Sequence, residues 1–212
     1  LHILRDKFLS GEFGRNLQAG LQELTPVSAH GDLGAASIKL DATHFAEAYE
    51  NSILCLDKLT PHQRDVLAEC QASTRGLHVK APAGAGKTFV ALHFLLKVLY
   101  DDTGALRADA RVLFCVKNLP LALFVTRWVA QRANGYVERD ALLSRLHLLY
   151  APFDQGPRVV TLKGTTLSPQ ELSQGERYAC MYDLIVVDEA HHIWLDDHLR
   201  TEVERYKGKR RM

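Results

Sequence analysis

The sequence lacks the features that would place it in a membrane or secretory class. No run approaches the ~20 consecutive apolar residues that a bilayer-spanning helix needs. The first residues also lack the order of charged, apolar and small residues that marks a secretory signal. We therefore expect an intracellular protein without membrane contact, and the sequence does not distinguish cytoplasm from nucleus.

Cysteine is scarce and widely spaced. The four cysteines are Cys55, Cys70, Cys115 and Cys180, and no two of them form a CxxC pair. This spacing argues against a disulfide scaffold and against a zinc site, and it favours reduced, buried thiols.

An excess of one charge is also missing. The 26 basic and 25 acidic residues give a net charge of +1, which neither supports nor excludes nucleic-acid binding. A hydrophobic content of 47% and a charged content of 24% are ordinary for a globular protein. The length of 212 residues suits one α/β domain with a small appendage. We divide the chain into a mostly helical or loop segment, 1–58, and a domain, 59–212.

Apolar runs and helical patterns alternate from residue 59 onward. We expect helices at 60–72, 87–100, 118–132, 138–150 and 193–207, a helical turn at 169–173, and strands at 77–81, 111–116, 158–163 and 183–188. Strands that are apolar throughout are typical of a parallel sheet that helices cover on both faces. The expected fold class is therefore α/β.

Residues 81–88 read Ala-Pro-Ala-Gly-Ala-Gly-Lys-Thr between an expected strand and an expected helix. Small residues let successive backbone N–H groups turn inward around a phosphate, and the following helix N-terminus adds partial positive charge. The candidate nucleotide-binding residues are Pro82, Ala83, Gly84, Ala85, Gly86, Lys87 and Thr88. Lys87 would reach the β- and γ-phosphates of ATP, and the Thr88 hydroxyl would bind Mg²⁺. Ala81 stands where the usual pattern has glycine.

A second motif follows the apolar run 183–187, where Asp188 and Glu189 end the expected strand. Ligands collect at the carboxyl ends of parallel strands. We expect Asp188 to hold Mg²⁺ and Glu189 to position and deprotonate the attacking water. The alternative is an acidic strand end that faces solvent, which the phosphate loop upstream disfavours. One of His191 and His192 would sense the γ-phosphate or a bound strand.

Four segments resemble superfamily 1 helicases, of the UvrD and Schlafen-like kind, in their first RecA-like domain. They are 59–67, 81–88, 112–122 and 183–191, within a likeness that covers about residues 59–195. The wording Asp-Glu-Ala-His is closer to Schlafen-like domains than to repair helicases, and the DEAH-box group comes second. The resemblance implies a P-loop NTPase of RecA-like form, a three-layer sandwich around a mostly parallel sheet, with ATP and Mg²⁺ as ligands.

The resemblance also implies partners and further contacts. It implies binding to single-stranded DNA or RNA and a second RecA-like domain beyond this segment, without which ATP hydrolysis would be weak. Gln63 would read the adenine, but Thr60 and Gln63 also form the pattern of a helix capping box. Asn118 would contact the nucleic-acid strand or cap a helix, and Thr165 and Thr166 are candidates for phosphate-backbone contacts. We expect the basic residues 207–211 to be solvated.

Two function classes stay open on these observations. The first is a nucleic-acid-dependent motor that hydrolyses ATP. The second is an ATP-driven switch in signalling or defence, in which the same motifs control assembly without unwinding. A non-catalytic domain with a relic loop is disfavoured, because Lys87, Thr88, Asp188 and Glu189 are all present.

Overall fold

The computed structural model describes residue 54 and residues 58–74, 76–163 and 166–212. Contacts divide the chain into two units, Leu1–Leu56 and Asp57–Met212, and every described residue except Leu54 belongs to the second. The helices and loops expected in 1–58 lie outside the described residues, except at Leu54, which is helical, and at Lys58, which is not. Among the described helices, none has the length and apolar character needed to span a membrane.

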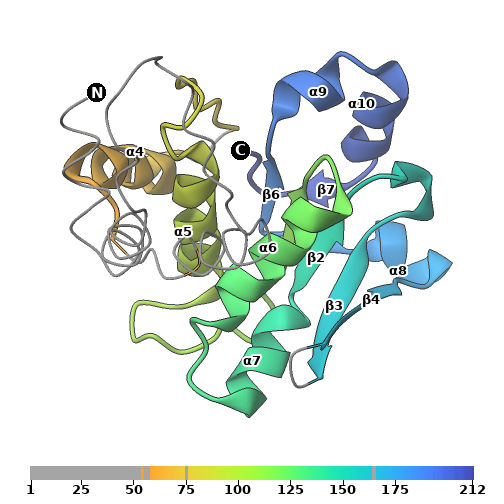
Figure 1. Cartoon of the computed structure of the whole chain (residues 1–212), viewed down its shortest axis with the longest axis horizontal. Helices are drawn as coiled ribbons and strands as arrows, with labels where there is room; N and C mark the ends of the chain where they lie inside the picture. The colour runs from red at the N-terminus through yellow and green to blue at the C-terminus, as the bar shows by residue number, and fades with distance from the viewer. Residues whose placement is uncertain (1–53, 55–57, 75, 164–165) are drawn as a thin grey trace, which may run out of the picture. The chain divides into compact units, whose positions relative to one another are not determined.

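Helices and strands alternate along the second unit (Figure 1). In chain order they are α4 (Pro61–Ala72), α5 (Lys87–Leu99), β1 (Val112–Cys115), α6 (Leu119–Ala130), α7 (Tyr136–Leu143), β2 (Leu146–Leu149), the 3-10 turn η1 (Phe153–Gln155), β3 (Arg158–Lys163), β4 (Thr166–Glu171), α8 (Gln174–Ala179), β5 (Met181–Tyr182), β6 (Leu184–Val187), α9 (Ala190–Trp194), α10 (Asp197–Glu204) and β7 (Lys207–Gly208). This order confirms the expected α/β class.

The central sheet has five strands in the order β4-β3-β2-β1-β6. Its core is parallel: Phe114 of β1 pairs with Leu148 of β2 on one side and with Val186 of β6 on the other. The hairpin β3–β4 adds two antiparallel strands beyond β2. Because β2, β1 and β6 run in the same direction, their carboxyl ends meet at one edge of the sheet.

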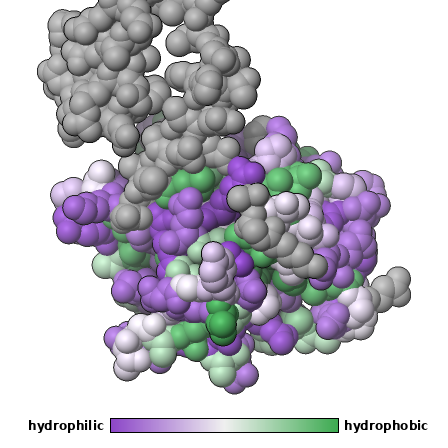
Figure 2. Space-filling model, turned by 60° about the horizontal axis from the view of Figure 1, so that its bottom comes forward, coloured by the Kyte–Doolittle hydropathy of each residue, from purple (hydrophilic) through white to green (hydrophobic). Residues whose placement is uncertain are grey.

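Helices cover both faces of this sheet, as Figure 1 shows. Side chains alternate along each strand, so Leu113 and Cys115 of β1 face one side while Val112 and Phe114 face the other. The first side packs on a buried cluster that includes Ile193 of α9 and Val203 of α10. On the second side α5 contacts β1 and β6, and α7 contacts β2 and β3. On the surface drawn in Figure 2, hydrophobic residues form small areas between hydrophilic ones.

The expected helix 138–150 is wrong in its second half. Helix α7 ends at Leu143, and the next apolar residues form strand β2, in which all four residues are buried between β1 and β3. A short apolar run has no periodicity that separates a buried strand from a buried helix. Pairing with two neighbouring strands decides for the strand.

Two further expectations differ from the structure. Residues 169–173 form no helical turn, because Pro169 lies in β4 opposite Val160. Strand β4 is at the edge of the sheet, where the missing N–H of proline leaves no partner unsatisfied. The expected helix 193–207 is divided into α9 and α10, and the Asp196 carboxylate starts the second by accepting from the N–H groups of His198 (2.9 Å) and Leu199 (3.2 Å).

The sequence suggested that the basic tail is solvated, but its backbone forms hydrogen bonds with the rest of the domain. Strand β7 pairs with β5, and the next residues run beside β6, where the N–H of Ile185 donates to the Arg210 carbonyl (2.9 Å) and the N–H of Met212 donates to the Ile185 carbonyl (2.8 Å). Gly208 permits this approach, because a Cβ there would lie 2.7 Å from Cγ1 of Ile185. Charge describes only the side chains, whereas backbone hydrogen bonds determine this position.

Residues 77–81 form no ladder of strand hydrogen bonds, in contrast to the expectation. The segment is extended but unassigned to a strand, and the N–H of Leu77 donates to the Arg211 carbonyl (2.8 Å). The tail therefore lies between this segment and β6, and its backbone forms hydrogen bonds with both.

Candidate functional site

Residues 83–86 form a tight turn that leads directly into α5. Gly84 and Gly86 both adopt left-handed backbone conformations, with φ of 77° and 84°. Glycine reaches this region without the steric cost that a Cβ brings. At Gly86 a Cβ would also collide with the Gln63 amide nitrogen. The small residues of the motif are thus required by the shape of the loop.

The Lys87 ammonium folds back onto this loop. Its Nζ donates to the carbonyl oxygens of Ala81 (3.0 Å) and Pro82 (3.1 Å). Lys87 is the first residue of the 13-residue helix α5, whose N-terminal N–H groups lie at the same place. An ammonium and a helix N-terminus together form an environment suited to an anion.

Asp188 directly follows β6 and is joined to the first turn of α5. The Thr88 hydroxyl donates to Oδ2 of Asp188 at 2.7 Å, and the N–H of Glu189 donates to Oδ1 at 3.0 Å. The N–H of Asp188 donates to the carbonyl of Cys115 (2.9 Å), which fixes the residue to the end of β1. Two sequence motifs a hundred positions apart therefore meet at one edge of the sheet.

Burial makes the Asp188 carboxylate electrostatically unfavourable. The side chain is buried, and desolvation raises its pKa above the ordinary value. Hydrogen bonds from Thr88 and from the Glu189 N–H, and the charge of Lys87, oppose this shift without cancelling it. A cation beside the carboxylate would reverse the pKa shift.

The donor set at this point fits Mg²⁺. A hydroxyl oxygen of Thr88 and a carboxylate oxygen of Asp188 are hard ligands, and Mg²⁺ characteristically combines one or two protein ligands with water and phosphate oxygens. Within the described residues no group of three or more His, Cys, Asp or Glu could enclose a metal ion. The arrangement therefore suits a cation shared with a ligand better than a closed protein cage.

Glu189 has an unusual backbone. Its φ of 51° makes it the only described residue other than glycine with positive φ. Such a conformation costs energy and concentrates at functional sites. Its Oε2 lies 3.3 Å from Nδ1 of His191, and both side chains are partly exposed. The sequence motif indicated Glu189, but it held no signal for the geometry of this pair.

One cavity of about 1010 Å³ contains the residues of both motifs. Its lining includes Gly84, Gly86, Lys87, Thr88, Asp188 and Glu189. Trp194 and Met212 also line it, and the sequence interpretation missed both. Residues four positions apart, such as Ala190 and Trp194, share one face of a helix. This signal could have found Trp194 only if a helix had been expected to start at residue 190. Most of the nucleotide- and metal-site candidates of the sequence therefore line one cavity, and Pro82, Ala85 and Gln63 do not.

Gln63 makes both the capping contacts and a contact to the loop. Its Oε1 accepts from the Thr60 N–H (2.9 Å), and the Thr60 hydroxyl accepts from the Gln63 N–H (3.3 Å), so the capping box is formed. Its Nε2 donates to the carbonyl of Ala85 (3.1 Å). Gln63 therefore lies at the phosphate loop, and recognition of adenine stays a prediction.

The residues expected at a nucleic-acid strand do not gather in this way. Asn118 follows β1 and caps α6, because its Oδ1 accepts from the Leu121 N–H (3.1 Å). Thr165 lies outside the described residues. Thr166 is exposed at the start of β4, and because β3 runs antiparallel to β2, this turn is at the amino ends of the parallel strands. The structure thus places Thr166 at the edge of the sheet opposite to Asp188.

A family model described as the res subunit of type III restriction enzymes, ResIII, matches residues 56–210. No curated protein and no solved structure matches the chain. The matched family is a helicase-like P-loop domain of superfamily 2 with a RecA-like fold, and the finding does not support the expected assignment to superfamily 1. ATP hydrolysis of the helicase type is the general function of such domains. The chain belongs to the ResIII family, type III restriction enzyme res subunit.

Proposed function

We propose that this domain binds and hydrolyses Mg²⁺–ATP as the first motor domain of a nucleic-acid-dependent translocase. The observation that carries the proposal is the 2.7 Å hydrogen bond between Thr88 and Asp188 beside the phosphate loop. This bond holds the buried Asp188 carboxylate beside the phosphate loop, and both line one cavity, as hydrolysis of a nucleotide requires.

Each residue has a separate role in this proposal. The N–H groups of residues 84–88 surround the β-phosphate, and Lys87 exchanges its two carbonyl partners for phosphate oxygens. Thr88 and Asp188 would hold Mg²⁺, which when bound neutralises developing charge on the phosphates. Glu189 accepts a proton from the attacking water, and His191 orients the Glu189 carboxylate from 3.3 Å.

Nucleic acid enters the proposal through the family and through the position of Asn118. Asn118 lies three residues beyond the carboxyl end of β1, the strand next to β6, which Asp188 directly follows. A nucleic-acid strand bound at this edge would be close to the hydrolytic site. A second RecA-like domain would close over the nucleotide, so we expect slow turnover from this segment alone.

Stimulation of ATP hydrolysis by single-stranded DNA or RNA tests this proposal. The expected stimulation falls steeply with salt, because phosphate contacts release counterions. Asn118→Asp keeps an oxygen that caps α6 but adds a negative charge, and should abolish the stimulation. Asn118→Ser keeps the cap without that charge and is the matched control. Turnover that no nucleic acid changes would contradict the motor and favour an ATP-driven switch.

A further inference from the structure

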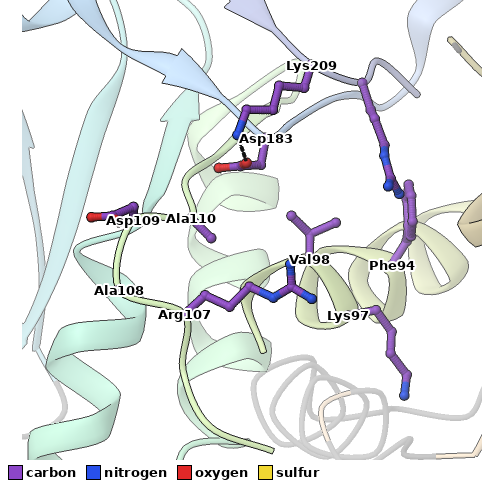
Figure 3. A pocket seen from close by; sticks show the side chains of 10 residues that line it. Phe94, Lys97, Val98, Arg107, Ala108, Asp109, Ala110, Asp183 and Lys209 are labelled. Atoms are coloured by element: carbon purple, nitrogen blue, oxygen red, sulfur yellow. Dashed lines mark hydrogen bonds and ion pairs between the residues drawn. The ribbon is translucent and has the colours of Figure 1, made fainter. Parts of the chain in front are cut away.

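A second cavity, of about 390 Å³, lies at the opposite end of the parallel strands (Figure 3). Asp183, which immediately precedes β6, lines it, whereas Asp188 at the other end of β6 belongs to the nucleotide cavity. Its walls come from α5, from the loop 107–110 before β1, and from Lys209 and Arg210 of the tail. The two cavities are therefore separate sites at opposite edges of the sheet.

The charge of this second cavity is unbalanced. Four cations line it, Lys97, Arg107, Lys209 and Arg210, against two acids, Asp109 and Asp183. The Asp183 carboxylate is already engaged, because Oδ1 accepts from Lys209 at 2.7 Å and Oδ2 accepts from the Arg111 N–H at 3.0 Å. Figure 3 shows the side chain of Asp109 pointing away from the cavity. Neither acid thus neutralises the arginines.

Arg107 and Arg210 are the arginines of this cavity, and neither forms an ion pair with the two acids that line it. Arg107 uses Nε to donate to the Tyr100 carbonyl (3.2 Å), and Figure 3 shows its guanidinium extending to the cavity beside Val98. The Arg210 side chain is half-buried, and no hydrogen bond or ion pair joins it to the part of the chain that the structure describes. Arg107 is exposed, so water solvates its charge, whereas Arg210 is half-buried in a cavity whose apolar walls include Phe94 and Val98. A bound anion would give both guanidinium groups a charged partner that the acids lining the cavity do not provide.

We propose that this cavity binds a phosphate group, with Arg107 and Arg210 as its hydrogen-bond donors. Guanidinium groups present planar pairs of N–H donors that match phosphate oxygens in a bidentate manner. The volume of 390 Å³ is within the range of small-molecule sites. The phosphate belongs either to a small phosphorylated molecule or to a nucleic-acid backbone. Both sources present anionic phosphate oxygens that accept hydrogen bonds from guanidinium groups.

Calorimetric titration with inorganic phosphate at constant ionic strength tests the site. The full 212-residue chain is used with Lys87→Ala, so that the phosphate loop does not compete for the probe. We expect Arg107→Gln and Arg210→Gln each to weaken phosphate binding at least tenfold, because each removes charge-assisted donors. Arg64→Gln, an exposed arginine of α4 away from the cavity, is the charge-matched control and should change nothing.

Arg210→Gln separates binding from folding, since its side chain forms no hydrogen bond or ion pair with the described residues. Circular dichroism and thermal unfolding of this variant should match those of its parent. A parallel titration with a short single-stranded oligonucleotide distinguishes the two sources: tighter Arg210-dependent binding of the oligonucleotide assigns the site to a nucleic-acid backbone. Absence of phosphate binding, or binding that neither arginine variant weakens, would overturn the proposal. Neither result depends on whether the nucleotide cavity hydrolyses ATP.

Discussion

The Thr88 hydroxyl donates a 2.7 Å hydrogen bond to Oδ2 of Asp188, and it joins the first turn of α5 to the end of β6. The bond connects the two motifs on which the proposed hydrolysis depends. It also keeps the carboxylate in a buried position that is unfavourable for its charge. Stability and function are therefore opposed at Asp188.

Asp188→Asn should stabilise the chain in the absence of Mg²⁺ and abolish hydrolysis. Desolvation raises the pKa of Asp188 in the folded state, so the folded chain binds more protons than the unfolded chain above pH ~4, and its stability falls as pH rises through the raised pKa. Asparagine removes the charge but can still bond the Thr88 hydroxyl. The advantage of the variant should grow across that window and then level off.

Urea unfolding of both proteins between pH 4 and pH 8 measures this difference. In thermal unfolding, each kcal/mol of added stability would raise Tm by about 2–4 °C for a chain of this size. Asp65→Asn, on the exposed side of α4, controls for a general effect of removing a carboxylate. A variant that is less stable than the parent at every pH would contradict the account of Asp188.

Glu189→Gln should bind ATP as tightly as the parent and lose about 10²-fold or more in turnover, because the amide accepts no proton from water. Equilibrium binding and single-turnover hydrolysis measure the two properties.

The strain in the backbone of Glu189 is tested by a second comparison. Since φ at Glu189 is 51°, Glu189→Gly should be more stable than Glu189→Ala by about 1 kcal/mol. Equal stability of these two variants would show that the left-handed turn is unstrained.

Gln63→Glu should separate the helix cap from the contact to the phosphate loop. Glutamate keeps the oxygen that accepts from the Thr60 N–H but has no donor for the Ala85 carbonyl. We expect unchanged thermal stability and weaker nucleotide binding. Gln63→Ala loses both contacts and should also cost about 1 kcal/mol of stability.

The same variants test whether Gln63 recognises adenine. If it does, Gln63→Glu should reduce the preference for ATP over GTP, whereas a role limited to the loop would weaken both nucleotides equally. Unchanged affinity for both nucleotides would remove Gln63 from the site.

Local signals predicted those parts of the fold that depend on local interactions. Helix α4 begins where the capping box of Thr60 and Gln63 indicated, and α5 begins at Lys87 as the phosphate-loop motif required. Strand β6 follows from an apolar run that is too short and too β-branched for a helix. Asp188 follows β6 at the carboxyl edge of the sheet as expected, whereas Thr88 reaches it from a loop whose preceding segment, 77–81, is not a strand.

Features that depend on distant partners were not predictable. Strand β2 contains leucine and histidine in a run that suits a helix equally, and only β1 and β3 make it a strand. The tail contains basic residues, yet its backbone pairs with Ile185 of β6. Thr166 lies at the edge of the sheet opposite to Asp188 because β3 and β4 run as an antiparallel hairpin, which no local pattern showed.

Binding and turnover of Mg²⁺–ATP by Lys87→Ala test the central claim most directly. Lys207→Ala, an exposed lysine of β7, is the matched control. We expect Lys87→Ala to weaken ATP binding at least tenfold and to remove measurable hydrolysis. Lys207→Ala should leave both unchanged, because Lys207, unlike Lys87, does not line the nucleotide cavity. Equal ATP binding by Lys87→Ala and the parent chain would contradict the assignment of the cavity to the nucleotide.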